Sequence, residues 1–201
     1  MKSAFMDQES GKQELLSLLN EKYNGEFQIV KNEKFNKYGL IYSYSCVAAP
    51  IENITQEFNA IITSDEKLKD NFQLWLFRDE MIKKGEQLCS KLELVQSYEV
   101  IPQMGISEKK WDSQYSLEQF VQESGAYLIL EIRLGDEIEE IEYVEKIRDI
   151  LGNIYNQDIV IEVRIDSKDG SVFWETLTPA SNPLSDKEIK EAIETAIDGR
   201  W

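Results

Sequence analysis

Two segments with alternating apolar residues, 126–134 and 158–166, flank one helical segment in the second half of the chain. The first reads AYLILEIRL and the second DIVIEVRID. Alternation with a period of two predicts a strand that buries one face. The intervening segment has apolar residues every three or four positions, which predicts an amphipathic helix. Because a helical crossover can return the chain to the same end of a sheet, the three segments predict one pair of parallel strands.

The remaining periodicities predict a mixed fold with mostly antiparallel sheet. The first half reads as a helix, three strands with short links, and a long helix from about 65 to 95. The second half reads as helix, strand, helix, strand, strand and helix, in which a Ser-Lys-Asp-Gly turn at 167–170 joins the last two strands as a hairpin. We therefore expect an α+β protein made of two similar-sized α/β halves, with mostly antiparallel sheet covered by helices.

The boundary between the halves is predicted from a segment without clear period. Residues 98–115 contain Pro102 and Gly105 and follow neither a helical nor a strand pattern. The expected domains are an N-terminal half at 1–97, an irregular connector at 98–115, and an acidic C-terminal half at 116–201. One continuous domain is the alternative.

The net charge of −16 is distributed unevenly along the 201 residues. Residues 1–100 hold 16 acids and 12 bases, a net charge of −4, and residues 101–201 hold 22 acids and 10 bases, a net charge of −12. Such a surface repels phosphate backbones and anionic membranes, so direct nucleic-acid binding and membrane insertion are not expected. It favours a basic protein partner. Solubility alone is the other explanation.

Several enzyme classes lack their residues in this chain. Histidine is absent, which excludes imidazole-based triads and the commonest metal ligand. Cys46 and Cys89 lie far apart and fall in apolar patterns, so we expect two buried thiols. No glycine-rich phosphate motif occurs. A carboxylate-dependent enzyme stays open, but we expect no catalytic residue, cofactor or metal.

The most acidic stretch, GDEIEEIEYVEKIRD at 135–149, predicts an amphipathic helix. Asp136 is the expected N-cap, with Glu139 at the capping-box position. Its expected buried stripe consists of Ile138, Ile141, Val144, Ile147, Leu151 and Ile154. Negative charge in the first turn is favoured by the helix dipole, but this does not account for Glu145 and Asp149.

Six residues are candidate contacts for a basic partner. Glu140, Glu145 and Asp149 are expected on the outer face of the acidic helix. Glu131 and Glu162 are expected on the outer faces of the two flanking strands, where arginines at alternate positions allow charged ladders. Trp111 lies beside two lysines in the irregular segment, so it is either an exposed contact or a plug between the halves.

The first 85 or so residues carry a family resemblance. The stretches LLSLLNEKYNGEFQIV, YSYSCVAAPIENITQEFNAIIT and DNFQLWLFRDEM resemble a pattern found in small uncharacterised proteins of Gram-positive bacteria (Firmicutes). The resemblance implies either an immunity partner of a secreted antibacterial toxin or an exported lipoprotein. It brings no defined site residue to this sequence.

Together these observations predict a non-catalytic, acidic protein-binding module. The expected role is that of an immunity or inhibitor protein that neutralises a basic partner such as a toxin or an enzyme. Alternatives are an extracellular lipoprotein-type domain that binds a ligand, and a phage-type inhibitor that imitates nucleic acid through its carboxylates. A cytoplasmic location is expected from the sequence as written, and an extracellular, membrane-anchored one if an anchor has been removed.

Overall fold

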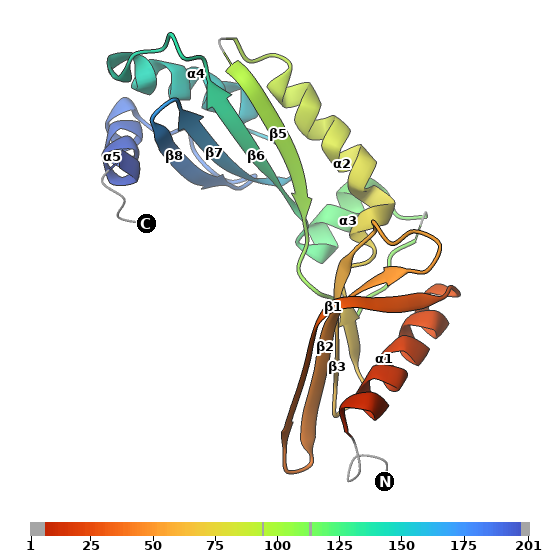
Figure 1. The fold of residues 1–201 in the computed structure, drawn as a ribbon. Helices are drawn as coiled ribbons and strands as arrows, with labels where there is room; N and C mark the ends of the chain where they lie inside the picture. Colours follow the sequence, from red (N-terminus) through yellow and green to blue (C-terminus); the bar gives the residue numbers. More distant parts are fainter. Residues whose placement is uncertain (1–6, 94, 113, 198–201) are drawn as a thin grey trace. The chain divides into compact units, whose positions relative to one another are not determined.

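The chain has an α+β fold with two four-stranded sheets, each in its own compact unit (Figure 1). The computed structural model describes residues 7–93, 95–112 and 114–197. Unit 1 comprises Met1–Leu76 and Met104–Tyr115, and unit 2 comprises Phe77–Gln103 and Ser116–Trp201. The predicted fold class is confirmed. The boundaries of these units differ from those of the predicted domains. The chain passes from unit 1 into unit 2 at Phe77, returns to unit 1 at Met104 and enters unit 2 again at Ser116.

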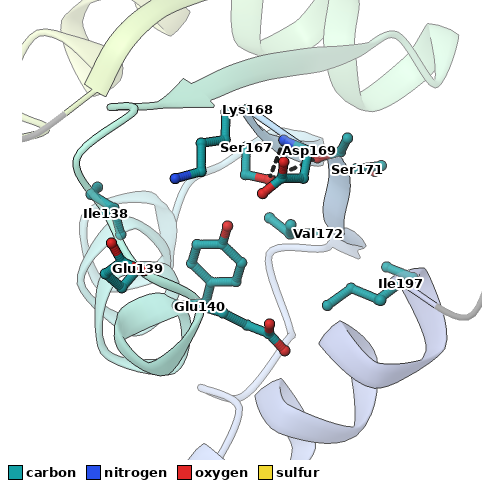
Figure 2. A pocket seen from close by; sticks show the side chains of 12 residues that line it. Ile138, Glu139, Glu140, Ser167, Lys168, Asp169, Ser171, Val172 and Ile197 are labelled. Atoms are coloured by element: carbon teal, nitrogen blue, oxygen red, sulfur yellow. Dashed lines mark hydrogen bonds between the residues drawn. The ribbon is translucent and has the colours of Figure 1, made fainter.

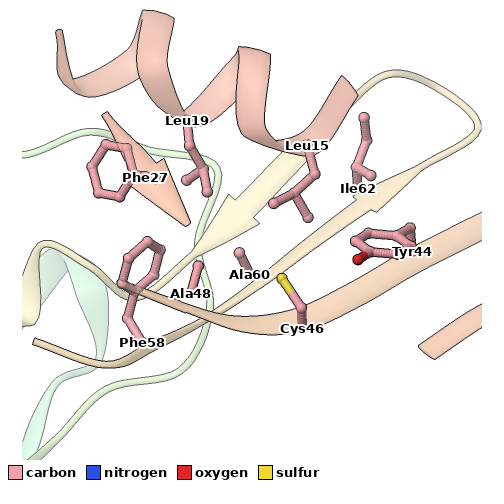
Figure 3. Close-up of a cluster of buried hydrophobic side chains, with 9 residues drawn as sticks. All are labelled: Leu15, Leu19, Phe27, Tyr44, Cys46, Ala48, Phe58, Ala60 and Ile62. Carbon is pink, nitrogen blue, oxygen red and sulfur yellow. The ribbon is translucent and has the colours of Figure 1, made fainter. Parts of the chain in front are cut away.

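Unit 1 is an antiparallel meander covered by one helix. Its elements are α1 (Gln8–Tyr23), β1 (Phe27–Tyr38), β2 (Ile41–Pro50), β3 (Phe58–Thr63) and β4 (Leu68–Asp70), and the strands pair in chain order. Leu15 and Leu19 of α1 are fully buried over the apolar face of the sheet (Figure 3). Tyr44, Cys46 and Ala48 alternate along β2 and lie beneath the helix.

A buried polar network holds the returning segment 104–115 on unit 1. The Asp70 side chain is fully buried and accepts from Lys22 Nζ at 2.9 Å and from the Tyr23 hydroxyl at 2.7 Å. Gln73 donates to the Tyr23 hydroxyl and accepts from the backbone N–H of Trp111 at 3.3 Å. Burial and the nearby Asp70 carboxylate raise the pKa of Tyr23. Helix α1, strand β4 and the returning segment are thus joined through side chains that satisfy one another.

Unit 2 contains the predicted parallel pair. Its strands are β5 (Val95–Gln103), β6 (Tyr127–Leu134), β7 (Val160–Ser167) and β8 (Gly170–Leu177), and β6 pairs with β7 in parallel while the other neighbours are antiparallel. Its helices are α2 (Leu74–Cys89, whose first turn belongs to unit 1), α3 (Leu117–Ser124), the 3₁₀ helix η2 (Glu140–Glu142), α4 (Tyr143–Ile154) and α5 (Asp186–Ile197). The predicted turn at 167–170 joins β7 to β8.

Two sequence predictions in the middle of the chain are wrong. The expected helix at 65–95 is strand β4 followed by the shorter helix α2. The expected connector at 98–115 begins as strand β5, the edge strand of the second sheet. An edge strand needs no strict alternation and tolerates Pro102, so its sequence showed no period.

Gly85 marks a close helix-to-sheet contact rather than a break in α2. A Cβ atom at this position would lie 2.4 Å from Val100 Cγ1 and 3.3 Å from Leu130 Cδ2. Nearby, Phe77 of α2 stacks on Phe120 of α3 with ring centroids 4.1 Å apart. Glycine therefore lets α2 approach β5 and β6 closely. None of the described helices is both long and apolar enough to span a membrane.

Candidate docking groove

In the acidic stretch, α4 is preceded by non-helical residues and a 3₁₀ turn, so its isoleucines do not share one helical face. Glu139, not Asp136, is the N-cap, and it forms a reciprocal capping box with Glu142. Helix α4 starts only at Tyr143, after η2. Ile138 lies before this N-cap in non-helical backbone, so one α-helical stripe does not run from Ile138 into η2 and α4. Ile138 is buried as predicted, but Ile141 is 90% exposed.

An open groove lies between η2–α4 and α5, all within unit 2. Its volume is about 540 Å³. In α5, Ile189 and Ile193 are buried, but Ile197 is 51% exposed and contributes to this groove. Its lining consists of Glu140, Ile141, Val144, Lys190, Ile193, Glu194 and Ile197. We call this surface the α4–α5 groove.

A second pocket adjoins the groove and shares Glu140 and Ile197 with it. Its volume is about 430 Å³, and the β7–β8 turn forms one wall. In Figure 2, Ile138 and Glu139 lie on one side and Ile197 on the other. Within the turn, the Ser167 hydroxyl donates to the Gly170 carbonyl and accepts from the Asp169 backbone N–H. We call this hollow the turn pocket.

Carboxylates outnumber cations around these two hollows. Their charged lining residues are Glu139, Glu140, Asp169 and Glu194 with Lys168 and Lys190, a local excess of two negative charges. Lys190 lies 4.0 Å from Glu194, and Lys168 donates to the Asp136 carbonyl oxygen. Among the described residues, no ion pair involves Glu140. The groove therefore combines exposed apolar side chains with a carboxylate that can receive a cation.

The other two predicted contacts on α4 are exposed but lie away from the α4–α5 groove. Glu145 and Asp149 are four residues apart, so they share one stripe of the helix. Asp149 lines a separate hollow of about 240 Å³ together with Lys91 and Lys146. Of the three helix residues predicted as contacts, Glu140 alone lines the α4–α5 groove.

The predicted charged ladder exists, and its arginine, Arg164, already pairs with both of the predicted contact glutamates. Arg164 on β7 lies opposite Glu131 on β6. Its guanidinium lies 3.0 Å from the Glu131 carboxylate and 2.6 Å from that of Glu162, and it sits over the Trp174 ring. Hydrogen bonding to Glu162 is the main cause of the raised pKa of Arg164. A basic partner would have to displace this cation to use either carboxylate.

Trp111 is not an exposed contact, which corrects its prediction as a partner-binding residue. Its side chain is only 1% exposed, and it belongs to unit 1. The neighbouring Lys110 donates to the Lys22 carbonyl oxygen at 2.6 Å, which fixes the segment against the end of α1. The irregular sequence around Trp111 gave no sign of this burial, because it depends on the network around Asp70.

Both cysteines are buried and free, as predicted. Burial raises the pKa of Cys46 to about 12 and that of Cys89 to about 11. A thiol with a pKa this high is a poor nucleophile at neutral pH. No group of three or more His, Cys, Asp or Glu side chains is positioned to hold a metal ion in the described part of the chain.

Sequence reasoning missed the two exposed isoleucines that define the groove. Each fits a helical period with buried neighbours, so periodicity predicts burial, but Ile141 is 90% and Ile197 51% exposed. The one available signal is that Ile141 lies directly between Glu140 and Glu142. That signal does not separate it from Ile138, which also has acidic neighbours on both sides and is buried.

Comparison with known proteins places the fold but not a family. No protein-family model and no curated protein matches the sequence. A solved structure of a DUF5037 family protein from Ruminococcus gnavus ATCC 29149 is similar, with a TM-score of 0.50 and 11% sequence identity. The similarity covers 91% of this chain and 98% of that chain. At this identity the likeness concerns the arrangement of helices and strands alone.

Proposed function

We propose that this chain is a non-catalytic protein-binding module that captures a basic partner, such as a toxin or an enzyme, at the α4–α5 groove. The observation that carries the proposal is the 90% exposure of Ile141 at the edge of a carboxylate-rimmed groove. Exposed apolar surface with a polar rim is typical of protein-binding sites. An immunity or inhibitor role is the form of this function that the acidic surface and the resemblance of the first half support.

Charge and apolar contact have separate parts in this proposal. The net charge of −16 attracts a basic partner from a distance and speeds association, an effect that salt screens. Ile141 and Ile197 then supply the short-range contact, which salt does not weaken. The resulting complex forms more slowly in high salt but keeps a residual affinity.

The test is binding of the purified chain to the product of the adjacent gene, measured at low and at high salt. We expect Ile141→Asp and Ile197→Asp each to weaken binding by about tenfold or more, which corresponds to about 1.4 kcal/mol. Ile54→Asp is the matched control, because Ile54 is 54% exposed in unit 1 and lies outside the groove. It should leave binding unchanged.

Charge reversal tests the electrostatic part separately. The triple variant Glu140→Lys, Glu145→Lys and Asp149→Lys should slow association at low salt while leaving the fold intact, because all three side chains are exposed. No complex with any co-encoded protein at low salt would refute the proposed function. Equal binding by wild type and the isoleucine variants would place the contact elsewhere.

A further inference from the structure

Tyr143 is a buried side chain whose hydroxyl has no hydrogen-bond partner among the described residues. It is the first residue of α4, is only 4% exposed, and lines the turn pocket but not the α4–α5 groove. Every fully enclosed side-chain oxygen or nitrogen in the described ranges does have a partner, so the Tyr143 hydroxyl must open into the turn pocket. Because buried tyrosine hydroxyls normally form a hydrogen bond, this one is available to a ligand.

Two carboxylates reach the same pocket from different elements. Asp169 extends from the β7–β8 turn and Glu140 from η2 (Figure 2). Both are exposed, and neither forms an ion pair with a described residue. Together with Glu139 and Lys168, the charged lining residues leave an excess of two negative charges. A carboxylate can only accept hydrogen bonds, so this arrangement favours a ligand that is a donor and carries positive charge.

The rest of the turn pocket is apolar. Ile138, Val172 and Ala196 are buried, and Ile197 is about half exposed. Figure 2 shows Val172 and Ile197 across the pocket from Ile138. The volume of about 430 Å³ lies within the roughly 300–1,000 Å³ range of small-ligand pockets, which typically combine apolar walls with a few polar groups.

We propose that the turn pocket binds an organic cation, namely an ammonium or guanidinium group on an alkyl stem. The charged head lies between Glu140 and Asp169, where the Tyr143 hydroxyl accepts a hydrogen bond from it. The alkyl stem lies against Val172 and Ile197. A bare metal ion does not fit, because the carboxylates of the described residues are not grouped closely enough to hold one.

This inference deepens the proposed function and rests on it for one of two sources of the cation. A basic partner supplies such a group as a lysine or arginine side chain, which enters the turn pocket while apolar residues of the partner contact Ile141 in the adjoining groove. A free alkyl amine or guanidine has the same chemistry. Both sources place the same head group beside Tyr143.

Titration of the full chain with N-acetyl-arginine amide, followed by backbone amide chemical shifts, tests the site itself. We expect saturable shifts at residues 138–143, 167–172 and 196–197, with a Kd of about 1 mM for so small a ligand. The neutral N-acetyl-norleucine amide and the anionic N-acetyl-glutamate amide should bind at least about tenfold more weakly. Equal binding of the three probes, or no saturable shift below about 10 mM, would overturn the proposal.

Two variants test the groups that hold the head. Tyr143→Phe should raise the Kd of the arginine probe about tenfold and leave Tm unchanged, because the hydroxyl bonds to no described residue. Asp169→Asn, in a turn that asparagine also suits, should raise it about threefold. Glu145→Gln is the matched control, since it removes a charge from an exposed position of α4 outside the pocket and should leave the Kd unchanged. Unaltered binding by Tyr143→Phe and Asp169→Asn would refute the site.

Competition with the co-encoded partner identifies the source of the cation. Displacement of the partner by the arginine probe, together with weaker partner binding by Asp169→Asn, assigns the pocket to a side chain of the partner. A probe that binds as expected without affecting the partner assigns it to a free amine or guanidine. The two proposals fail separately. A partner that binds through Ile141 while the probe does not bind removes only the turn-pocket site, and a bound probe without any partner complex removes only the proposed function.

Discussion

Units 1 and 2 both bury an apolar core, but they differ in where their structurally important carboxylates lie. Unit 1 buries a carboxylate, Asp70, at the centre of a side-chain network and exposes Tyr38, Leu40 and Ile41 at the turn between β1 and β2. Unit 2 has an apolar interior and exposes carboxylates around an apolar groove. The difference shows that the charge of this chain has two separate uses. One buried acid fixes the path of the chain in unit 1, and surface acids rim the α4–α5 groove, the proposed binding surface, in unit 2.

The largest effect is expected from removing the buried acid. Asp70→Ala leaves Lys22, whose side chain is 13% exposed, without its carboxylate and removes the acceptor of the Tyr23 hydroxyl. Breaking a buried pair in this way typically costs about 3–5 kcal/mol of unfolding free energy. The unfolding free energy is measured by urea denaturation, with the reactivity of the Cys46 thiol as the signal for unit 1.

The matched control for that variant is Asp65→Ala in the same unit. Asp65 pairs with Lys67, and both side chains are more than half exposed. A surface pair of this kind contributes little, so the unfolding free energy should change by less than about 0.5 kcal/mol. Equal effects of the two variants would mean that the buried network does not stabilise unit 1.

Unit 2 should instead be sensitive to packing. Gly85→Ala would place a methyl group against Val100 and Leu130, and such overpacking costs about 1–3 kcal/mol. Gly152→Ala is its opposite, because no atom lies within 4 Å of the added Cβ on the exposed side of α4. It should stabilise by about 0.5–1 kcal/mol through the higher helix propensity of alanine. Thermal denaturation should show a lower Tm for Gly85→Ala and a higher Tm for Gly152→Ala than for wild type. A lower Tm for Gly152→Ala would contradict the exposed, uncrowded position of Gly152 on α4.

High pH should weaken unit 1 through Cys46. The folded-state pKa of this thiol is about 12, above the value of roughly 8.5 in an unfolded chain. Between these values only the unfolded state loses the proton, so stability falls as pH rises above about 8.5. Between about pH 7.5 and pH 9.5 the loss from this thiol is about 1.4 kcal/mol. Over the same pH range, the unfolding free energy of Cys46→Ala should fall by about 1.4 kcal/mol less than that of wild type. Equal falls in the two proteins would contradict this prediction.

The smallest expected effect concerns whether the two units unfold independently of each other. Cys46 lies in unit 1 and Cys89 in unit 2, and both are buried. Pulse labelling with a thiol reagent in increasing urea therefore reports each unit by its own cysteine. In Asp70→Ala we expect the Cys46 midpoint to shift and the Cys89 midpoint to move less. A common shift of both would show that the two units unfold as one.

Sequence periodicity predicted the elements that bury one continuous face and failed where other forces decide. The alternation around Leu130 and Val163 predicted β6, β7 and their parallel pairing, because every second residue is buried. The strand at 95–103 was missed because an edge strand is only partly covered. The return of 104–115 to unit 1 follows from hydrogen bonds to Gln73 and contacts with Asp70, which no local pattern encodes.

The candidate site was predictable in charge but not in shape. The acidic excess of the second half and the exposure of Glu140 follow from the sequence. The groove itself depends on where the helix begins, since 135–139 are not helical and Ile141, in η2 just before α4, is exposed. Helical period alone assigns Ile141 and Ile138 to the same face. The late start of the helix, rather than any motif, leaves Ile141 exposed.

Amide hydrogen exchange of the full chain, with and without the co-encoded partner, tests the central claim most directly. It reports which unit and which face the partner covers. The proposed function predicts new protection at residues 139–144 and 190–197, on the two sides of the α4–α5 groove. Protection confined to β6 and β7, or to unit 1, would contradict it and move the binding surface away from the groove.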